Sequence, residues 1–327
     1  MKAFTNANPK SVAQALTFIR DARAAGRTVA IAGGGSDLVG MVKERLAAPD
    51  VLVRLKVIDG LDQVKAEKDG VMIGGQTTLD AISRHDLLRQ KYAVLAEAAQ
   101  DVATPQIRNV ATIAGNVCQR PWCWYYRNGF KCFKAGGNTC YSANGENEFH
   151  AIFGGGPSYI VHPSDTAAAL VALDATFTIA GASGRRFVKA AEFFTLPTVN
   201  ASRENVLADG EILESMTLPG RPGARSAYHK VMDREAWTHA VVSSAVVLDM
   251  NGAVCRSARV VLGGVAPIPW RLPEVEKMLA GQRITSELAA KAGEAAVSSA
   301  RPLAKNGYKV PLTRNLVARA IQDVAHA

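Results

Sequence analysis

Four cysteines lie close together in the middle of the chain. Cys118, Cys123, Cys132 and Cys140 share one segment, whereas Cys255 stands alone in a strand-like run. The chain has 327 residues, of which 48% are hydrophobic, so it does not need the disulfide framework of small secreted domains. The cluster therefore favours metal or iron–sulfur ligation, and Cys255 is interpreted as a core residue.

A glycine-rich loop could bind phosphate. The apolar run 28–32 predicts a buried strand, Gly33–Asp37 follows it, and a short helix is expected over 38–44. Glycines let backbone N–H groups approach an anion, and the helix N-terminus adds its dipole. The loop matches neither the P-loop nor the GxGxxG pattern. A tight turn is therefore the alternative interpretation.

A second loop of small residues strengthens the phosphate interpretation. Residues 111–116 (ATIAGN) offer hydrogen-bond donors at Thr112, Gly115 and Asn116. Two such loops, about 80 residues apart, could hold one long dinucleotide between them.

The elements that must position these loops alternate between helix and strand. Helices are expected over residues 12–25, 78–103 with a break near His85, 165–173, 273–280, 286–300 and 313–325. Strands are expected over residues 28–32, 51–58, 71–73, 176–179, 186–188, 212–218, 241–249 and 257–262. The segment from 117 to about 157 lacks periodicity and is expected to be a loop insertion held by whatever the cysteines bind. The sequence PGRPGA at 219–224 predicts a linker, and it divides the chain into domains 1–220 and 221–327.

Composition excludes several classes of protein. The net charge is +9, but Lys and Arg are spread along the chain, so a basic patch facing an anionic cofactor or an acidic partner is favoured over nucleic-acid binding. No apolar run reaches the length of a membrane span, so no membrane span is expected. The N-terminal residues lack a signal-peptide pattern, which predicts a cytoplasmic protein. The histidines show no metal-ligand spacing, and no nucleophile triad is evident.

Six motifs in a fixed order resemble the FAD-binding medium subunits of the molybdenum hydroxylases, the family of xanthine dehydrogenase and aldehyde oxidoreductase. The motifs lie at residues 33–38 (GGGSDL), 106–116 (QIRNVATIAGN), 163–165 (PSD), 210–213 (GEIL), 228–234 (YHKVMDR) and 262–271 (LGGVAPIPWR). The match runs nearly end to end.

The resemblance implies an α+β fold. A two-subdomain FAD-binding domain of the vanillyl-alcohol-oxidase type, with subdomains 1–60 and 61–220, would precede a small C-terminal domain of sheet and helices. It assigns FAD contacts to Gly33, Gly34, Gly35, Ser36, Asp37, Thr112, Ala114, Gly115, Asn116, Asp165, Leu213 and Lys230. Lys230 would lie near the flavin and stabilise its reduced, anionic form. Trp237 is expected either to stack near the flavin ring or to be a core aromatic.

The cysteine segment resembles an insertion found in a subset of the family, which carries an additional [4Fe–4S] cluster. Its expected ligands are Cys118, Cys123, Cys132 and Cys140. Such relatives place the fourth cysteine shortly before the PSD motif, where this chain has Ser158. Cys118 is the preferred substitute. Ser158, water or another residue as fourth ligand, loss of the cluster, and a zinc ion are the alternatives.

The resemblance implies an electron-transfer subunit. Electrons would pass from a large subunit with molybdenum cofactor, through the [2Fe–2S] centres of a small subunit, to FAD on this chain and then to a terminal acceptor. Some relatives are exported folded, together with a partner that has a leader. A flavin-free scaffold or metal-binding subunit, and a stand-alone FAD oxidase, are the rival functions. The substrate and the acceptor are not predicted.

Overall fold

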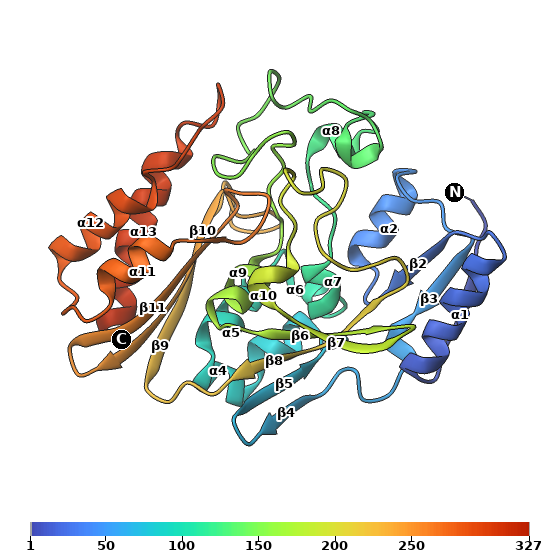
Figure 1. The fold of residues 1–327 in the computed structure, drawn as a ribbon, viewed down its shortest axis with the longest axis horizontal. Coiled ribbons are helices and arrows are strands. Elements are labelled where there is room, and N and C mark those ends of the chain that lie inside the picture. The colour runs from blue at the N-terminus through green and yellow to red at the C-terminus, as the bar shows by residue number, and fades with distance from the viewer. Residues whose placement is uncertain (1, 327) are drawn as a thin grey trace.

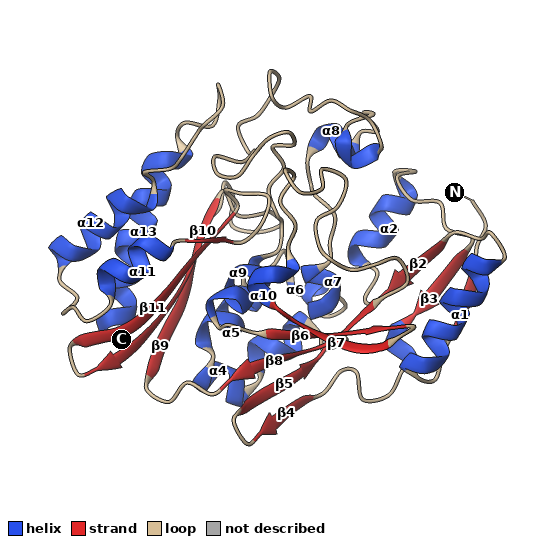
Figure 2. Ribbon diagram, viewed as in Figure 1, coloured by secondary structure: helices blue, strands red, loops and turns tan. Residues whose placement is uncertain are grey.

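The computed structural model describes residues 2–326, which form three sheets with their helices (Figures 1 and 2). The N-terminal unit contains β1 (Thr5–Ala7), α1 (Val12–Ala24), β2 (Val29–Ala32), α2 (Ser36–Lys43), β3 (Val51–Arg54) and the 3₁₀ turn η1 (Leu55–Val57). Its strands are parallel in the order β1-β3-β2. Ser11 caps α1 by accepting a hydrogen bond from Gln14 N, and α1 buries Ala15 and Ile19 against this sheet.

A second, antiparallel sheet forms the middle of the molecule. It has the order β4-β5-β8-β6-β7 and consists of β4 (Val64–Glu67), β5 (Gly70–Gly74), β6 (Thr176–Gly181), β7 (Gly184–Lys189) and β8 (Ile212–Pro219). The helices of this unit are α3 (Leu79–Arg84), α4 (Asp86–Lys91), α5 (Ala93–Gln100), α6 (Pro105–Arg108), α7 (Ile113–Val117), α9 (Asp165–Ala172) and α10 (Ala190–Phe193). The break near His85 in the helical stretch expected over 78–103 is confirmed, and a second break at Tyr92 was not expected. Extended backbone at His85 and an irregular Tyr92 divide it into three helices.

The C-terminal unit is an antiparallel sheet covered by helices. The sheet has the order β12-β11-β10-β9, formed by β9 (Ala224–Val231), β10 (Val242–Asn251), β11 (Val254–Gly263) and β12 (Trp270–Arg271). Helices α11 (Pro273–Leu279), α12 (Ser286–Ala296) and α13 (Lys309–His326) pack on its outer side (Figure 1). Helix α13 begins earlier than expected because Pro311 falls in its first turn, where a missing N–H costs no helical hydrogen bond.

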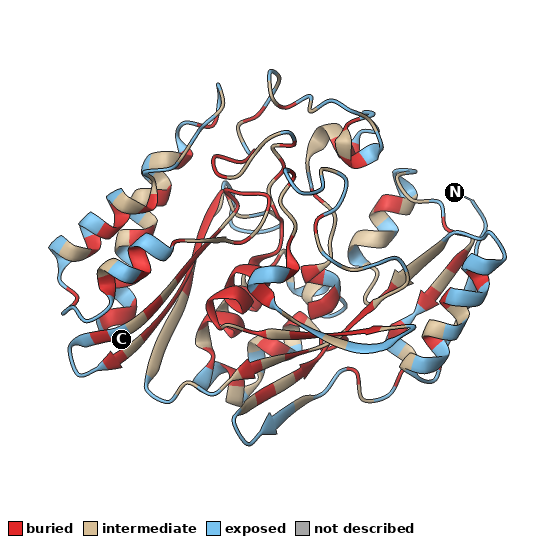
Figure 3. Cartoon of the chain, viewed as in Figure 1, coloured by how far each residue is buried: buried red, intermediate tan, exposed pale blue. Residues whose placement is uncertain are grey.

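The predicted fold class is confirmed, since all three units mix helices and strands as expected. The largest core contains the middle sheet with α5 and α9, and it continues into β9, β10 and β11 through Tyr228, Ala245 and Val261. Figure 3 shows α9 almost entirely buried between the two units.

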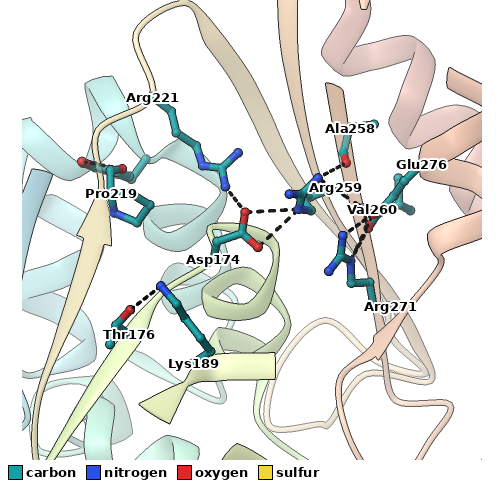
Figure 4. A network of polar contacts seen from close by, with 11 residues as sticks. Asp174, Thr176, Lys189, Pro219, Arg221, Ala258, Arg259, Val260, Arg271 and Glu276 are labelled. Carbon is teal, nitrogen blue, oxygen red and sulfur yellow. Dashed lines mark hydrogen bonds and ion pairs between the residues drawn. The ribbon is translucent and has the colours of Figure 1, made fainter. Parts of the chain in front are cut away.

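A polar network joins the middle and C-terminal units (Figure 4). Asp174, at the end of α9, forms an ion pair with Arg221 of the linker and accepts hydrogen bonds from Arg259 Nε of β11 at 3.2 and 3.3 Å. Arg259 lies 3.9 Å from Glu276, which pairs with Arg271 at 2.6 Å. The network fixes how the two units meet.

The cysteine segment is irregular, as expected. It contains only the short helix α8 (Trp124–Arg127) and the turn η2 (Phe133–Ala135), and it forms the green loop region at the top of Figure 1. No helix within residues 2–326 is both long and apolar enough to cross a bilayer.

Candidate functional site

A cleft of ≈570 Å³ opens beside the N-terminus of α2. Its walls come from α2, from the segment 103–119 and from the loop 234–239. The lining residues include Ser36, Asp37, Lys43, Ala103, Gly115, Asn116, Trp122, Asp165, Arg234, Trp237 and His239. Lys43 and Arg234 bring positive charge to the cleft, which suits an anionic ligand.

The glycine loop lies against the second loop with no room for side chains. A Cβ on Gly34 would lie 1.7 Å from the backbone oxygen of Val110, and a Cβ on Gly33 would lie 2.5 Å from Thr112 Oγ1. Gly35 adopts φ +77, which favours glycine. Within residues 2–326, the backbone N–H groups of Gly34, Gly35 and Ser36 have no hydrogen-bond acceptor. These donors are therefore available to an anion at the start of α2.

The second loop supplies shape more than backbone donors. Thr112 caps α7, and its Oγ1 accepts a hydrogen bond from Gly115 N at 3.2 Å. Ala114 N donates to the backbone oxygen of Gly75 at 3.0 Å, and Ala114 is buried. Of the expected donors, the backbone N–H groups of Gly115 and Asn116 are thus used inside the protein, where both donate to Thr112.

Asn116 is held with its amide nitrogen free for a ligand. Its Oδ1 accepts hydrogen bonds from Ser164 Oγ at 2.6 Å and from Thr166 Oγ1 at 2.7 Å. In the structure the amide oxygen is thus the end of the side chain that faces these two hydroxyls. Its Nδ2 has no protein partner within residues 2–326, and Asn116 lines the cleft. The hydrogen bond between Ser164 and Asn116 joins two loops whose residues are 48 positions apart in the sequence.

Asp165 lies in the cleft wall and is held from behind. Lys230 Nζ donates to its Oδ2 at 2.7 Å, and Tyr228 OH donates to its Oδ1 at 2.6 Å. The Lys230 ammonium also donates to the backbone oxygen of Asp101 at 2.8 Å, and its side chain is 0% exposed. Burial, together with Asp165, raises the pKa of Tyr228. The structure therefore places Lys230 beneath Asp165 and does not place it among the residues that line the cleft.

Asp37 connects the glycine loop to the cysteine segment. Its carboxylate accepts hydrogen bonds from Arg127 Nη2 at 2.7 Å and from Arg120 N at 3.1 Å. The Arg127 side chain is only 6% exposed, and its guanidinium lies over the ring of Trp122 at 4.1 Å. Asp37 borders the cleft, but its negative charge is paired with Arg127 of the cysteine segment.

Of the remaining residues expected from the sequence, Trp237 lines the cleft and Leu213 does not. Leu213 is buried in β8, where it pairs with Ile179, and it does not line the cleft. Trp237 is 56% exposed and lines the cleft, so it is not a core aromatic. Sequence reasoning missed Gln76 and Thr77, which follow β5 behind Gly33 and keep buried, unpartnered oxygens within the described part of the chain. The run GGQTT after a strand was the available signal.

Three of the four clustered cysteines come together. Cys123 and Cys132 share a small apolar cluster with Met41 and Tyr126. Burial raises the pKa of the Cys123 thiol to about 11, and the nearby Cys132 and Cys140 thiols add to this rise.

Cys118 lies apart from this group. It ends α7 and packs against the main core, where burial raises its pKa to about 12 with no thiol neighbour contributing. Ser158 is buried next to Tyr159, whose backbone N–H contacts Cys140 Sγ at 3.4 Å.

The cysteine group holds several polar contacts to sulfur. His150 Nε2 lies 3.3 Å from Cys123 Sγ, and burial lowers the pKa of His150 to about 4. Ser142 Oγ lies 3.1 Å from Cys140 Sγ. Among residues 2–326, no three His, Cys, Asp or Glu side chains are arranged to hold a metal ion.

A second cavity of ≈250 Å³ is lined by residues of the cysteine segment and of the PSD motif. Cys123, His150, Ser164 and Asp165 are among its lining residues. Asp165 borders both this cavity and the cleft.

Comparison with known proteins covers the whole chain. Residues 2–221 match the family model of the FAD-binding domain in molybdopterin dehydrogenase, and residues 226–324 match the CO dehydrogenase flavoprotein C-terminal domain. The chain is 32% identical over 328 residues to the aldehyde oxidoreductase FAD-binding subunit PaoB of Escherichia coli, covering 99% of this chain and 98% of that protein.

Two further relatives agree with these matches. The carbon monoxide dehydrogenase medium chain of Afipia carboxidovorans is 26% identical, with 98% of this chain and 96% of that protein covered. The crystal structure of a cyanide-inactivated Cu,Mo-CO dehydrogenase superposes with a TM-score of 0.78 at 25% identity, covering 100% of this chain and 99% of that chain.

Proposed function

Because the chain belongs to the FAD-binding subunits of the molybdenum hydroxylases, an oxidoreductase family of electron-transfer complexes, we propose that the cleft beside α2 binds one FAD. The observation that carries this assignment is the contact of the two small-residue loops. The close approach of Gly34 to Val110 leaves three unbonded N–H groups at the start of α2. A flavin supplies reversible uptake of two electrons, and the protein supplies binding and orientation.

The residues in and around the cleft have distinct roles in this proposal. The N–H groups of Gly34, Gly35 and Ser36 bind the pyrophosphate, with Lys43 and Arg234 balancing its charge. Of the other residues expected from sequence, Asn116 offers its free amide nitrogen and Asp165 offers a fixed carboxylate. Lys230, Leu213, Ala114 and Thr112 support these groups from behind, and Asp37 positions the insertion.

The first experiment is cofactor analysis of the anaerobically purified chain, followed by titration of flavin-free protein with FAD and with FMN. We expect about one FAD per chain and much weaker binding of FMN, which lacks the pyrophosphate and adenine. No flavin uptake after FAD addition would refute the proposal and favour a flavin-free scaffold.

We further propose that the chain works with a molybdenum-cofactor large subunit and a [2Fe–2S] small subunit. The support is that the relatives named above are an FAD-binding subunit of an aldehyde oxidoreductase and a medium chain of a carbon monoxide dehydrogenase, and that the sequence shows no evident nucleophile triad. Flavin on the isolated chain should be reduced by dithionite but not by an aldehyde. Aldehyde-dependent reduction by the chain alone would instead indicate a stand-alone oxidase.

The cysteine group is proposed to hold a [4Fe–4S] cluster through Cys123, Cys132 and Cys140. A cube carries each protein ligand on a different iron, so its thiolates lie farther apart than the ligands of one ion. The support is that three thiols lie near one another and that the sulfurs of Cys123 and Cys140 have polar contacts.

For the fourth ligand we favour Ser158 over Cys118. Ser158 adjoins the residue whose N–H contacts Cys140 Sγ, whereas Cys118 packs in another core. Iron should therefore stay near four per chain in Cys118→Ser. In Ser158→Cys the cluster should persist with an altered spectrum, and in Ser158→Ala it should lose one iron. Loss of the cluster in Cys118→Ser, with Ser158→Ala unaffected, would reverse the assignment.

A further inference from the structure

The ≈250 Å³ cavity lies beside the cleft that is proposed to bind FAD. Four residues line both spaces: Trp122, Asp165, Thr238 and His239. The rings of Trp122 and His239 pack together, with their centroids 5.3 Å apart. A small molecule in the cavity would therefore lie close to a ligand in the cleft.

The lining of the cavity is rich in aromatic side chains. Trp122, Trp124 and Phe149 contribute their rings. Among residues 2–326, no Lys or Arg lines the cavity, whereas Asp165 and Asp233 do. This lining disfavours an anionic ligand. It favours an apolar, planar one, which gains from contact with the aromatic rings.

Neither carboxylate in the lining requires a cationic ligand. Asp165 is paired with Lys230 at 2.7 Å and accepts a second hydrogen bond from Tyr228 OH. Asp233 is exposed to solvent and accepts a hydrogen bond from Thr238 Oγ1 at 2.6 Å. The cavity therefore suits a ligand without net charge.

The lining contains a buried hydrogen-bond donor, His162. Its Nδ1 accepts a hydrogen bond from Ser164 N at 3.3 Å, so the proton of the neutral imidazole lies on Nε2. This Nε2 has no hydrogen-bond partner among residues 2–326, and the backbone oxygen of Val117 lies near the ring without bonding to this nitrogen. A buried donor without an acceptor costs free energy. A carbonyl oxygen on a bound ligand would satisfy it.

Two residues at the start of α13 hold the cavity wall in place. Asn306 Nδ2 donates to the backbone oxygen of His150 at 3.1 Å. Lys309 Nζ donates to the backbone oxygens of Phe149 at 2.9 Å and of Gly264 at 2.7 Å. Both side chains belong to residues that are fully buried. The wall is therefore formed before any ligand arrives, which lowers the entropy cost of binding.

We propose that this cavity binds the headgroup of a quinone, with one carbonyl oxygen accepting the hydrogen bond of His162 Nε2–H and the ring lying among the aromatic side chains. The volume of ≈250 Å³ suits a headgroup of one or two rings. The inference rests on the FAD proposed above, which in its reduced form supplies the electrons. In that step the quinone takes up two electrons and two protons and becomes a hydroquinone, and reduced FAD gives up the same two electrons and two protons.

The test is calorimetric titration of the FAD-loaded chain with duroquinone, a fully methylated benzoquinone that has no free ring position for a cysteine to attack. Val161 lines the cavity, and Val161→Phe should weaken binding by about tenfold or more because the larger side chain takes up the space. Val199→Phe is the matched control, since Val199 is exposed and lines neither the cavity nor the cleft. It should bind duroquinone as the original chain does.

Two further measurements test the hydrogen bond and the electron step. Durene, the hydrocarbon of the same shape without carbonyl groups, should bind the original chain more weakly than duroquinone, and this comparison needs no variant. Flavin on the chain is then reduced with dithionite, and the excess is removed. Its anaerobic reoxidation should saturate as the duroquinone concentration rises, and Val161→Phe should need a higher concentration.

Several outcomes would overturn the inference. They are no binding of duroquinone to the FAD-loaded chain, equal binding in Val161→Phe and the original chain, durene binding as tightly as duroquinone, and reoxidation that never saturates. Failure of the FAD proposal is a separate result, because it appears as a chain that takes up no FAD. Titration of that flavin-free chain with duroquinone and durene would still decide whether the cavity binds a quinone.

Discussion

Lys230 offers the sharpest test of how the cleft is built. Its ammonium is fully buried and donates to Asp165 Oδ2 at 2.7 Å and to Asp101 O at 2.8 Å. In Lys230→Met the carboxylate of Asp165 stays buried without its cation. Removal of one partner of a buried pair costs about 3–5 kcal/mol, a large part of the roughly 5–15 kcal/mol that stabilises a typical domain.

The assay is urea unfolding of the chain, with and without added FAD. Lys43→Met is the matched control, since Lys43 is an exposed lysine that lines the cleft and whose side chain forms no hydrogen bond or ion pair within residues 2–326. It should cost less than about 0.5 kcal/mol of stability while weakening FAD binding. The double variant Lys230→Met, Asp165→Asn should recover part of the stability lost in Lys230→Met, because the unpaired charge is gone.

The opposite pattern would refute this reasoning. If Lys230→Met keeps the stability of the original chain and loses FAD affinity, then Lys230 acts directly on the flavin, as its sequence motif suggested. No recovery in the double variant would show that Lys230 contributes through packing and not through its charge.

Three further predictions follow from other parts of the structure. Gly34→Ala would place a Cβ 1.7 Å from Val110 O, so FAD content should fall severely, whereas Gly307→Ala, with nothing within 4 Å, should bind FAD normally; equal FAD content would contradict the loop contact. Burial lowers the pKa of His162 to about 3. As the pH falls, the unfolded state therefore takes up a proton at His162 at a higher pH than the folded state does. Stability should therefore fall by up to ~1.4 kcal/mol per unit as pH drops from about 6.5 toward 3, and urea titrations of His162→Phe should show a weaker pH slope. In Asp174→Asn, the asparagine can adopt the positive φ of 52 at this position, but the negative charge of the carboxylate is lost. It should cost about 1 kcal/mol at low salt and less at high salt, and a salt-independent loss would argue against the ion pairs in Figure 4.

Local signals made the elements predictable from sequence. Ser11 and Thr112 cap helices by bonding a backbone N–H three residues ahead, and such contacts depend only on the neighbouring chain. The glycine run after β2 predicted a close loop because only glycine accommodates φ +77 at Gly35 with so little space at Gly34. The family resemblance, carried by motif order, is confirmed together with the fold class.

Contacts between residues far apart in the sequence could not be predicted from the sequence. Asp37 pairs with Arg127, 90 positions away, and Lys230 is buried beneath Asp165, 65 positions away. No short-range pattern encodes either contact, because each depends on which faces of separate elements pack together. A charge in a motif therefore predicts a site, and only the packing decides whether that charge meets the ligand or another side chain.

The same distinction holds for the cysteines. Their spacing by itself determined that this segment is a candidate ligand loop, since four thiols in a short stretch have few other uses in a chain with a large core. Spacing could not separate Cys118 from the other three, because Cys118 ends α7 and follows that helix into the main core. It also could not bring His150 to Cys123, 27 positions away. The sequence by itself determines which residue types are available, and the burial of apolar faces decides which of them come into contact.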